Sequence, residues 1–133
     1  MEVRRVVTSF LLHRGRVLIL KRSGKVGSYR DRWAGVSGYL EEGEKPFQRA
    51  LKEIREEVGL KEGRVQLACI GEPLFVRDEE KRGILWMVHP FLFKTRSRRL
   101  RLDWESVDHR WIKPQEVSCY MVVPMLKETL EFV

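Results

Sequence analysis

Several features that would place a chain in a special class are missing or scarce here. The two cysteines, Cys69 and Cys119, do not form a CxxC motif, so we expect both to be reduced and buried like apolar side chains. No apolar run approaches the ~18 residues that suggest a membrane span, and the N-terminus lacks a secretory signal pattern. We therefore expect a cytoplasmic protein with no membrane partner.

Negative charge is the scarcer sign, with 19 Asp and Glu against 26 Lys and Arg, for a formal net charge of +7. This excess favours anionic partners such as phosphates, nucleotides or nucleic acid. Asparagine is absent and 34% of the residues are charged, so heat adaptation through ion pairs is an alternative explanation. With 133 residues, 43% of them hydrophobic, the chain fits one folded domain over residues 1–133.

Apolar and β-branched runs predict more strands than helices. The expected strands are residues 3–12, 17–20, 33–40, 65–70, 74–77, 84–93 and 107–112. A helix is expected from Pro46 to the residue before Gly59, where apolar residues recur at helical spacing, and a second helix over residues 124–133. Helices must cover the faces of such a sheet, so we expect an α+β fold with an α/β/α sandwich architecture.

The first helix carries three acids, Glu53, Glu56 and Glu57, whose spacing places them on one side. Like charges at this spacing repel, and a hard divalent cation such as Mg²⁺ would reverse that penalty. An ordinary surface helix is the alternative. Arg49–Glu53 and Lys52–Glu56 have the spacing of exposed ion pairs, which contribute about 0.3–0.5 kcal/mol each.

The residues around this helix form a longer pattern that favours the metal site. Gly38 is followed by five residues and Glu44, and seven more residues lead to the segment KEIREEVGL at residues 52–60. This resembles the Nudix box, G-x5-E-x7-R-E-U-x-E-E-x-G-U, in which U is a bulky aliphatic residue. Every fixed position over residues 38–60 matches except one, because Lys52 stands where the pattern has arginine.

The resemblance to MutT-like Nudix hydrolases implies a Nudix fold, in which a mixed β-sheet lies between helices and the box forms a loop–helix–loop. It also implies hydrolysis of a nucleoside diphosphate linked to another moiety, by water attacking phosphorus with Mg²⁺ or Mn²⁺ as cofactor. The implied metal ligands are Glu53, Glu56, Glu57 and the Gly38 carbonyl, with Glu53 and Glu57 taking part in catalysis and Glu44 supporting the site.

Two further positions are assigned within this resemblance. Lys52 is expected to support the site by offsetting negative charge, although lysine orients a carboxylate less well than the planar fork of arginine. Members of the family often take a general base from a later loop. Glu105, which precedes the strand at 107–112, is our choice for that catalytic role, with Glu79 and Glu80 as competitors.

Cations in front of the box are candidates for binding substrate phosphates. Arg22 and Arg32 are the two selected, at the ends of a polar loop that also contains Arg30. Four large aromatic residues could stack a nucleobase, but we expect them mainly in the core: Trp33, Phe75, Trp86 and Trp104.

A basic segment over residues 94–101 contains five cations. In a strand, alternation would put several of them on one face, as a track for RNA or polyphosphate. A solvated edge strand protected by charge is the alternative. Two other functions stay open: a pyrophosphohydrolase of RNA 5′ ends, which the basic segment supports, and a non-catalytic nucleotide- or RNA-binding module, which Lys52 in place of the arginine leaves open. The favoured partner is a small-molecule nucleotide, RNA is not favoured, and homodimer formation is left open.

Overall fold

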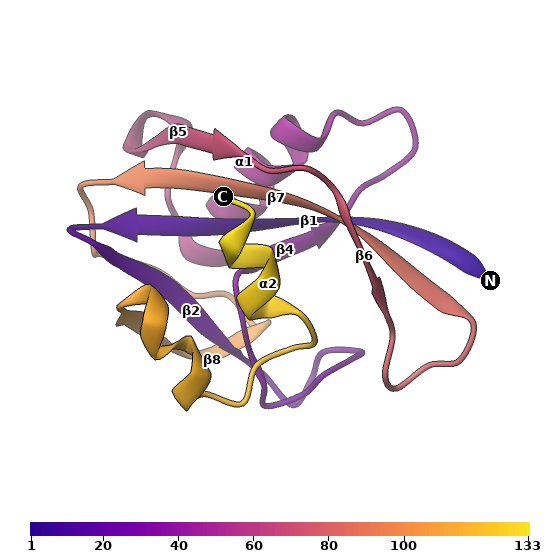
Figure 1. Ribbon diagram of the computed structural model, residues 1–133. Coiled ribbons are helices and arrows are strands. Elements are labelled where there is room, and N and C mark those ends of the chain that lie inside the picture. Colours follow the sequence, from indigo (N-terminus) through magenta and orange to yellow (C-terminus); the bar gives the residue numbers. More distant parts are fainter.

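The computed structural model describes all 133 residues and contains an eight-stranded sheet with helices on its faces (Figure 1). The strands are β1 (Glu2–His13), β2 (Arg16–Arg22), β3 (Trp33–Ala34), β4 (Val36–Tyr39), β5 (Val65–Ile70), β6 (Leu74–Arg77), β7 (Ile84–Thr95) and β8 (Ser106–Ile112). The helices are α1 (Pro46–Val58), α2 (Leu126–Glu131) and the 3₁₀ helices η1 (Glu62–Arg64) and η2 (Pro114–Cys119). None of them has the length and apolarity needed to cross a membrane.

Strand β1 is the centre of the sheet. It pairs in parallel with β7 along almost its whole length, from Glu2 opposite Ile84 to Leu12 opposite Lys94. It also pairs in an antiparallel sense with β2 and β4. Strand β2 in turn pairs with β3 and β8, and β7 pairs with β5 and β6. This mixture of parallel and antiparallel ladders confirms the mixed sheet expected of an α+β fold.

Both faces of the sheet bury apolar side chains, because successive residues of a strand point to opposite sides. One core contains Val7 and Leu11 of β1 and, from α1, Ala50, Ile54 and Val58. The other core contains Phe10 of β1 and, from the C-terminal part, Ile112, Val117 and Leu126. In Figure 1, α2 crosses in front of the sheet and α1 lies behind it. The expected sandwich architecture is confirmed.

Helix α1 has the bounds expected from its sequence. Pro46 occupies the first turn, where its missing N–H costs no hydrogen bond. Gly59 ends the helix in a left-handed conformation with φ of 77°, and its N–H donates to the Arg55 carbonyl at 3.1 Å. The apolar side chains of α1 pack against β1 and β7. The helix also contacts β4, which carries Gly38.

Three expectations about local structure are wrong. The predicted strand over 33–40 is divided at Gly35 into β3 and β4. The predicted helix over 124–133 is shorter, because the chain turns at Met125 with φ of 64° and α2 covers only Leu126–Glu131. Both cysteines are free, but Cys119 is exposed and Cys69 is only partly buried, so neither fills the core.

Candidate active site

A cavity of about 290 Å³ opens on the sheet beside the start of the box. Its walls come from β1, β4 and β7, the loop over residues 23–32, the segment before β8, and α2. Four residues predicted from the sequence line it, namely Arg22, Gly38, Glu53 and Glu105. The fold thus brings together side chains that lie up to 83 positions apart, as the difference between residues 22 and 105.

Gly38 allows the Glu53 carboxylate to lie against strand β4. A Cβ atom added at Gly38 would stand 2.2 Å from Cδ of Glu53 and 2.3 Å from its Oε1. Atoms at such distances overlap, so any side chain at position 38 would displace the carboxylate. Glycine is therefore required at this point for contact between α1 and β4 rather than for a special backbone angle. The Gly38 carbonyl remains a predicted metal ligand.

Arg49 makes the most extensive ion pairing in the box. Only 6% of its surface is exposed, and its Nε donates to Oε1 of Glu44 at 2.7 Å. Its Nη1 donates to Oε1 of Glu53 at 2.9 Å, and Nη2 lies 3.7 Å from Oε1 of Glu41. The hydrogen bond from Arg49 is the main reason that the pKa of Glu44 is lowered. The i,i+4 spacing of Arg49 and Glu53 alone does not distinguish this buried pair from an exposed one.

Lys52, at the position of the arginine in the box pattern, is exposed and forms no ion pair. The Lys52–Glu56 pair expected for an ordinary surface helix is therefore absent. The charge of Lys52 still acts at longer range, because it lowers the pKa of Glu44 slightly, after the larger contribution of Arg49.

The end of the box helix meets further acids. Glu57 is 5% exposed, and its Oε2 is buried without a hydrogen-bond partner. Burial, followed by the charges of Glu105 and Glu53, raises the pKa of Glu57 well above its ordinary value. Burial, followed by Asp103 and Glu53, raises the pKa of Glu105. The segment that carries Glu105 is fixed to α1, because the Asp103 N–H donates to the Glu57 carbonyl at 3.2 Å.

The residues present fit a hard divalent cation in their chemistry. Carboxylate and carbonyl oxygens are the ligands that Mg²⁺ prefers, and the unpartnered Oε2 of Glu57 is one such oxygen. Glu56, the residue before Glu57, is exposed. As the side chains lie, no three of them surround a common point. To share one ion, these carboxylates would have to move closer together.

The two arginines chosen for substrate binding have different surroundings. Arg22 lines the cavity, and its Nε and Nη2 donate to the carbonyl and hydroxyl of Ser28, at 3.0 and 3.4 Å. Arg32 does not line the cavity. Its Nη1 donates to the Val122 carbonyl at 3.4 Å and lies 3.8 Å from Oε1 of Glu79. The geometry therefore favours Arg22 over Arg32 for contact with a substrate.

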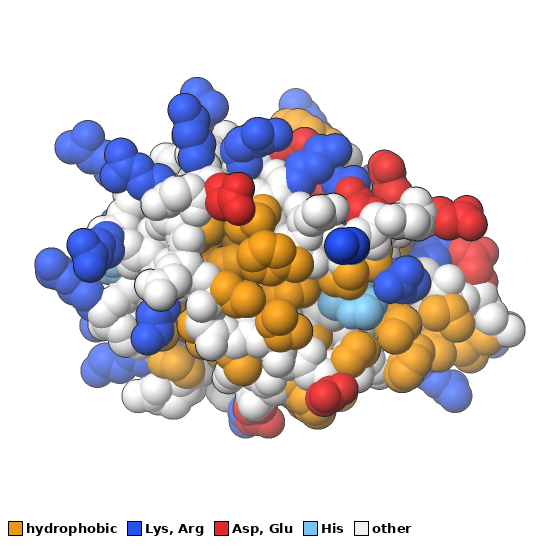
Figure 2. Space-filling view, turned by 90° about the horizontal axis from the view of Figure 1, so that it is seen from above, with side chains coloured by type: hydrophobic (Ala, Val, Ile, Leu, Met, Phe, Trp, Pro, Cys, Tyr) orange, Lys and Arg blue, Asp and Glu red, His pale blue; other side chains and the backbone are white.

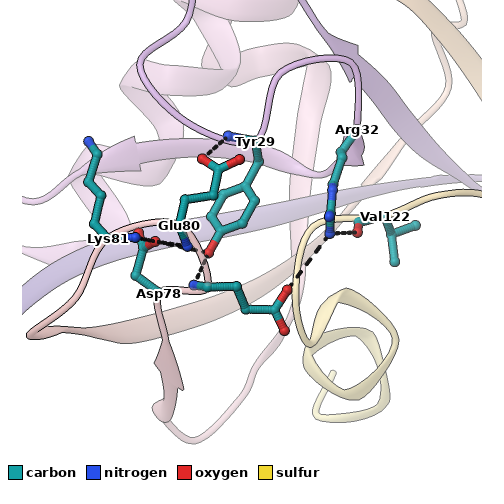
Figure 3. A network of polar contacts seen from close by, with 7 residues as sticks. Tyr29, Arg32, Asp78, Glu80, Lys81 and Val122 are labelled. Atoms are coloured by element: carbon teal, nitrogen blue, oxygen red, sulfur yellow. Dashed lines mark hydrogen bonds and ion pairs between the residues drawn. The ribbon is translucent and has the colours of Figure 1, made fainter.

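Tyr29 anchors the loop over residues 23–32 to the turn between β6 and β7 (Figure 3). Its hydroxyl donates to Oδ1 of Asp78 at 3.2 Å and accepts from the Glu79 N–H at 2.6 Å. Its own N–H donates to Oε1 of Glu80 at 2.9 Å. Asp78 also accepts from the Trp86 indole at 2.8 Å. Glu79 and Glu80, the competitors for the general base, therefore hold this loop, which the sequence did not reveal.

The large aromatic residues are divided between core and surface. Trp33 packs against the second core, as expected. Trp86 and Trp104 both line the cavity, and Trp104 is 60% exposed. Phe75 is 56% exposed, so the expectation of a core position is wrong for Phe75 and Trp104. A nucleobase entering the cavity would meet Trp86 and Trp104.

Most of the basic segment over residues 94–101 lies outside any strand. Strand β7 ends at Thr95, and the chain has no regular structure from there to the turn before β8. The five cations, Lys94, Arg96, Arg98, Arg99 and Arg101, are all exposed. Figure 2 shows Lys and Arg side chains standing out at the end of the molecule where β7 ends, while most acidic side chains gather toward the other end. The cations are solvated, but they do not share one face of a strand.

Comparison with known proteins agrees with this geometry. The model of the NUDIX domain family matches residues 3–131. The nucleoside triphosphatase NudI of Escherichia coli is 25% identical over 138 aligned positions, which cover 98% of this chain and 96% of that protein. NudI of Klebsiella pneumoniae is 26% identical, with the same coverage.

Solved structures share the fold at lower sequence identity. An Ap4A hydrolase of C. elegans superimposes with a TM-score of 0.79 at 18% identity, covering 96% of this chain and 93% of that one. A MutT protein of Methanosarcina mazei superimposes with a TM-score of 0.78 at 16% identity, covering 97% and 91%. Since the family model spans nearly the whole chain and the acidic helix lies where the box pattern requires, the protein belongs to the MutT-like Nudix hydrolases, enzymes that cleave pyrophosphate bonds.

Proposed function

We propose that the protein hydrolyses a nucleoside diphosphate linked to another moiety, through attack of water on phosphorus with Mg²⁺ or Mn²⁺ as cofactor. The observation that carries the proposal is the buried Glu57, which lies near Glu53 and Glu105 and has no ion-pair partner. Burying an unpaired carboxylate among like charges destabilises a fold. A bound divalent cation would offset that cost, and the substrate that needs such a cation is an anionic diphosphate.

The roles of the chain's own residues follow from their positions. Glu53, Glu56, Glu57 and the Gly38 carbonyl would hold the cation. When bound, a divalent cation neutralises charge developing on the diphosphate and lowers the pKa of coordinated water. Arg49 and Glu44 keep Glu53 in place on the opposite side of the box.

Glu105 serves as the general base in this proposal. It accepts a proton from the attacking water while the new P–O bond forms and the bond to the leaving phosphate breaks. Burial and neighbouring acids raise the pKa of Glu105, which makes its carboxylate a stronger base. Arg22, at the cavity wall, binds phosphate oxygens, for which its guanidinium has the right charge and geometry.

A small nucleotide is the proposed substrate. The NudI relatives are named nucleoside triphosphatases and the C. elegans neighbour an Ap4A hydrolase, and both kinds of substrate contain a nucleoside attached to phosphoanhydride bonds. The cavity of about 290 Å³, with Trp86 and Trp104 in its wall, suits a single nucleoside moiety. The basic segment offers no ordered strand for RNA. A cytoplasmic location and a single domain over residues 1–133 are part of the same proposal.

A substrate panel tests the proposal. The purified protein is incubated with nucleoside triphosphates, ADP-ribose, dinucleoside polyphosphates, and capped or triphosphorylated RNA, each with Mg²⁺, with Mn²⁺ and with chelator. Glu56→Gln/Glu57→Gln protein is the control for contaminating hydrolases, and Arg55→Met is the control for a change elsewhere on the exposed side of the helix. The products are separated by ion-exchange chromatography.

We expect metal-dependent release of a nucleotide product from at least one small substrate, and no release by the double glutamine variant. Nucleotide binding without turnover on any substrate would contradict hydrolysis and support a binding module. A preference for RNA that falls steeply with salt would contradict the choice of a small substrate and support an enzyme of RNA 5′ ends.

A further inference from the structure

The arginine that the box pattern places at position 52 is missing, and a different arginine lies at the carboxylates. Lys52 is exposed and pairs with no acid. Arg49, one helical turn earlier, is 6% exposed and is hydrogen-bonded to both Glu44 and Glu53. Residues three apart on a helix lie on the same side, so position 49 faces the same acidic region as position 52.

The guanidinium of Arg49 donates its two hydrogen bonds from different nitrogens. Nε is 2.7 Å from Glu44 and Nη1 is 2.9 Å from Glu53. Because the guanidinium is planar and rigid, these two contacts fix the orientation of both carboxylates relative to each other. The ammonium of a lysine is a single point charge and holds one position without fixing an angle.

Two groups confine the Glu53 carboxylate at its Oε1 atom. Gly38 leaves room only for the carboxylate, since a Cβ there would stand 2.2 Å from Cδ and 2.3 Å from Oε1 of Glu53. Arg49 donates to the same Oε1 at 2.9 Å. The other carboxyl oxygen of Glu53 is paired with no basic side chain, which leaves it available to a cation.

Glu44 extends the same network into the turn before the helix. Oε1 of Glu44 accepts from Arg49 and also from the Glu41 N–H, at 3.0 Å. The Arg49 N–H donates to the Lys45 carbonyl at 3.1 Å. Arg49 therefore connects the turn, the helix and the Gly38 strand at the point where a metal ligand is needed. A solvated i,i+4 pair, the ordinary reason for this spacing, would be exposed and would bind one acid only.

We propose that Arg49 is a positioning residue that supplies to Glu53 the orientation which arginine at position 52 would otherwise provide. The inference rests on the proposed function, because Glu53 is taken to be a metal ligand there. Arg49 itself touches neither water nor phosphate in the reaction. It fixes the carboxylate before the cation binds, so its loss weakens cation binding first and lowers turnover as a result.

Mn²⁺ affinity is the measurement that isolates this role. Electron paramagnetic resonance of free Mn²⁺ gives the dissociation constant without any turnover. Four proteins are compared with the wild type: Arg49→Lys, which keeps the charge but removes the fork; Arg49→Lys/Lys52→Arg, which returns a fork at the pattern position; Lys52→Arg alone; and Arg55→Met, which removes an exposed arginine from the same helix. Circular dichroism and Tm confirm that each protein is folded.

We expect Arg49→Lys to weaken Mn²⁺ binding by roughly 10-fold or more, in the range found when groups that orient metal ligands are changed. Lys52→Arg in that background should recover most of the loss, while Lys52→Arg alone and Arg55→Met should change the dissociation constant less than about threefold. Where Arg49→Lys is too unstable to measure, the same comparison is made with Arg49→Gln in the presence and absence of Lys52→Arg.

Wild-type Mn²⁺ affinity in folded Arg49→Lys protein would overturn the inference, and so would a loss that Lys52→Arg does not reduce at all. The proposed function fails in a different way. A wild-type protein that binds Mn²⁺ but hydrolyses no substrate contradicts the hydrolase proposal, while the effect of Arg49 on Mn²⁺ affinity is still measured and decided by the same four variants.

Discussion

Glu53 and Glu57 lie one turn apart on α1 and are almost equally buried, at 8% and 5% exposed, yet their electrostatic surroundings are opposite. Glu53 accepts a hydrogen bond from Arg49 and lies beside Gly38. Glu57 has a buried oxygen with no partner and lies near Glu105, whose charge raises the pKa of Glu57 further. One carboxylate is neutralised by the protein, and the other is not.

This difference gives the two carboxylates different roles in the site. At Glu53, the partner of the carboxylate is supplied by the protein itself, because Arg49 binds it and holds it in one orientation. The Glu57 side is left with excess negative charge, so a cation bound there would be stabilised most. Substitutions that change one side and leave the other intact test this division.

The largest effect is expected from Glu57→Gln. Glutamine has nearly the same shape but no charge, so it removes the attraction for the cation without creating a cavity. Metal contributes several kcal/mol to such reactions, so kcat/KM should fall on the order of 10³-fold, as measured on the best substrate of the panel. Activity within about threefold of wild type would remove Glu57 from the metal site.

A smaller fall is expected from Glu105→Gln, because this change removes the general base and leaves the box intact. We expect kcat to fall on the order of 10²-fold, with Mn²⁺ affinity within about threefold of wild type. The acid limb of the pH profile of kcat should disappear with the titrating carboxylate. Unchanged turnover would show that Glu105 is not the base.

The same substitution, Glu57→Gln, is expected to stabilise the metal-free protein, although it lowers activity. The pKa of Glu57 is raised by folding, so its contribution favours the fold below the ordinary value of 4.5 and is lost as pH rises through the raised pKa. At pH 8 without metal, Glu57→Gln should therefore raise Tm by roughly 2–8 °C, which corresponds to about 1 kcal/mol.

Measurements at low pH and with added Mn²⁺ distinguish this electrostatic effect on Tm from an effect of the substitution that is independent of charge. The Tm values of wild type and Glu57→Gln should converge as the pH falls below 4.5, because Glu57 is then protonated in both folded and unfolded chains. Mn²⁺ at a concentration that saturates the wild type should raise the Tm of the wild type more than that of the variant. A variant less stable than wild type at pH 8 would contradict the unpaired state of Glu57.

The smallest effect is expected from Lys52→Arg in the otherwise native chain. Lys52 is exposed and unpaired, and Arg49 already occupies the acids that a new arginine would bind. Activity should be preserved or raised, within about twofold, which is the usual range for a surface substitution. A large fall in kcat/KM would show that the lysine has a role of its own.

The sequence predicted what depends on local spacing. The bounds of α1 followed from Pro46 and Gly59, and the box pattern placed Gly38 and Glu53 in one site before any fold was known. Each of these predictions rests on residues close in the chain or on a spacing that the helix itself converts into proximity. The acidic side chains were therefore found, although their roles as ligands stay predictions.

What the sequence could not predict depends on distant segments. The spacing of Arg49 and Glu53 is the same for a surface pair and a buried one, and only packing against β4 distinguishes them. The attachment of Tyr29 to Asp78 joins two loops 49 positions apart, for which no local pattern exists. Arg32 was assigned to substrate because its charge was visible in the sequence and its contacts with Val122 and Glu79 were not.

The parallel pairing of β1 with β7 also governs when the site appears during synthesis. Residues 2–12 must wait for residues 84–94 before the central ladder forms, and closing so long a loop is slow. Glu105 leaves the ribosome later still. The residues of the box helix are therefore synthesised before the segment that crowds their carboxylates in the finished fold. Their repulsion would therefore first act late in folding, which is also when the proposed cation site would be complete.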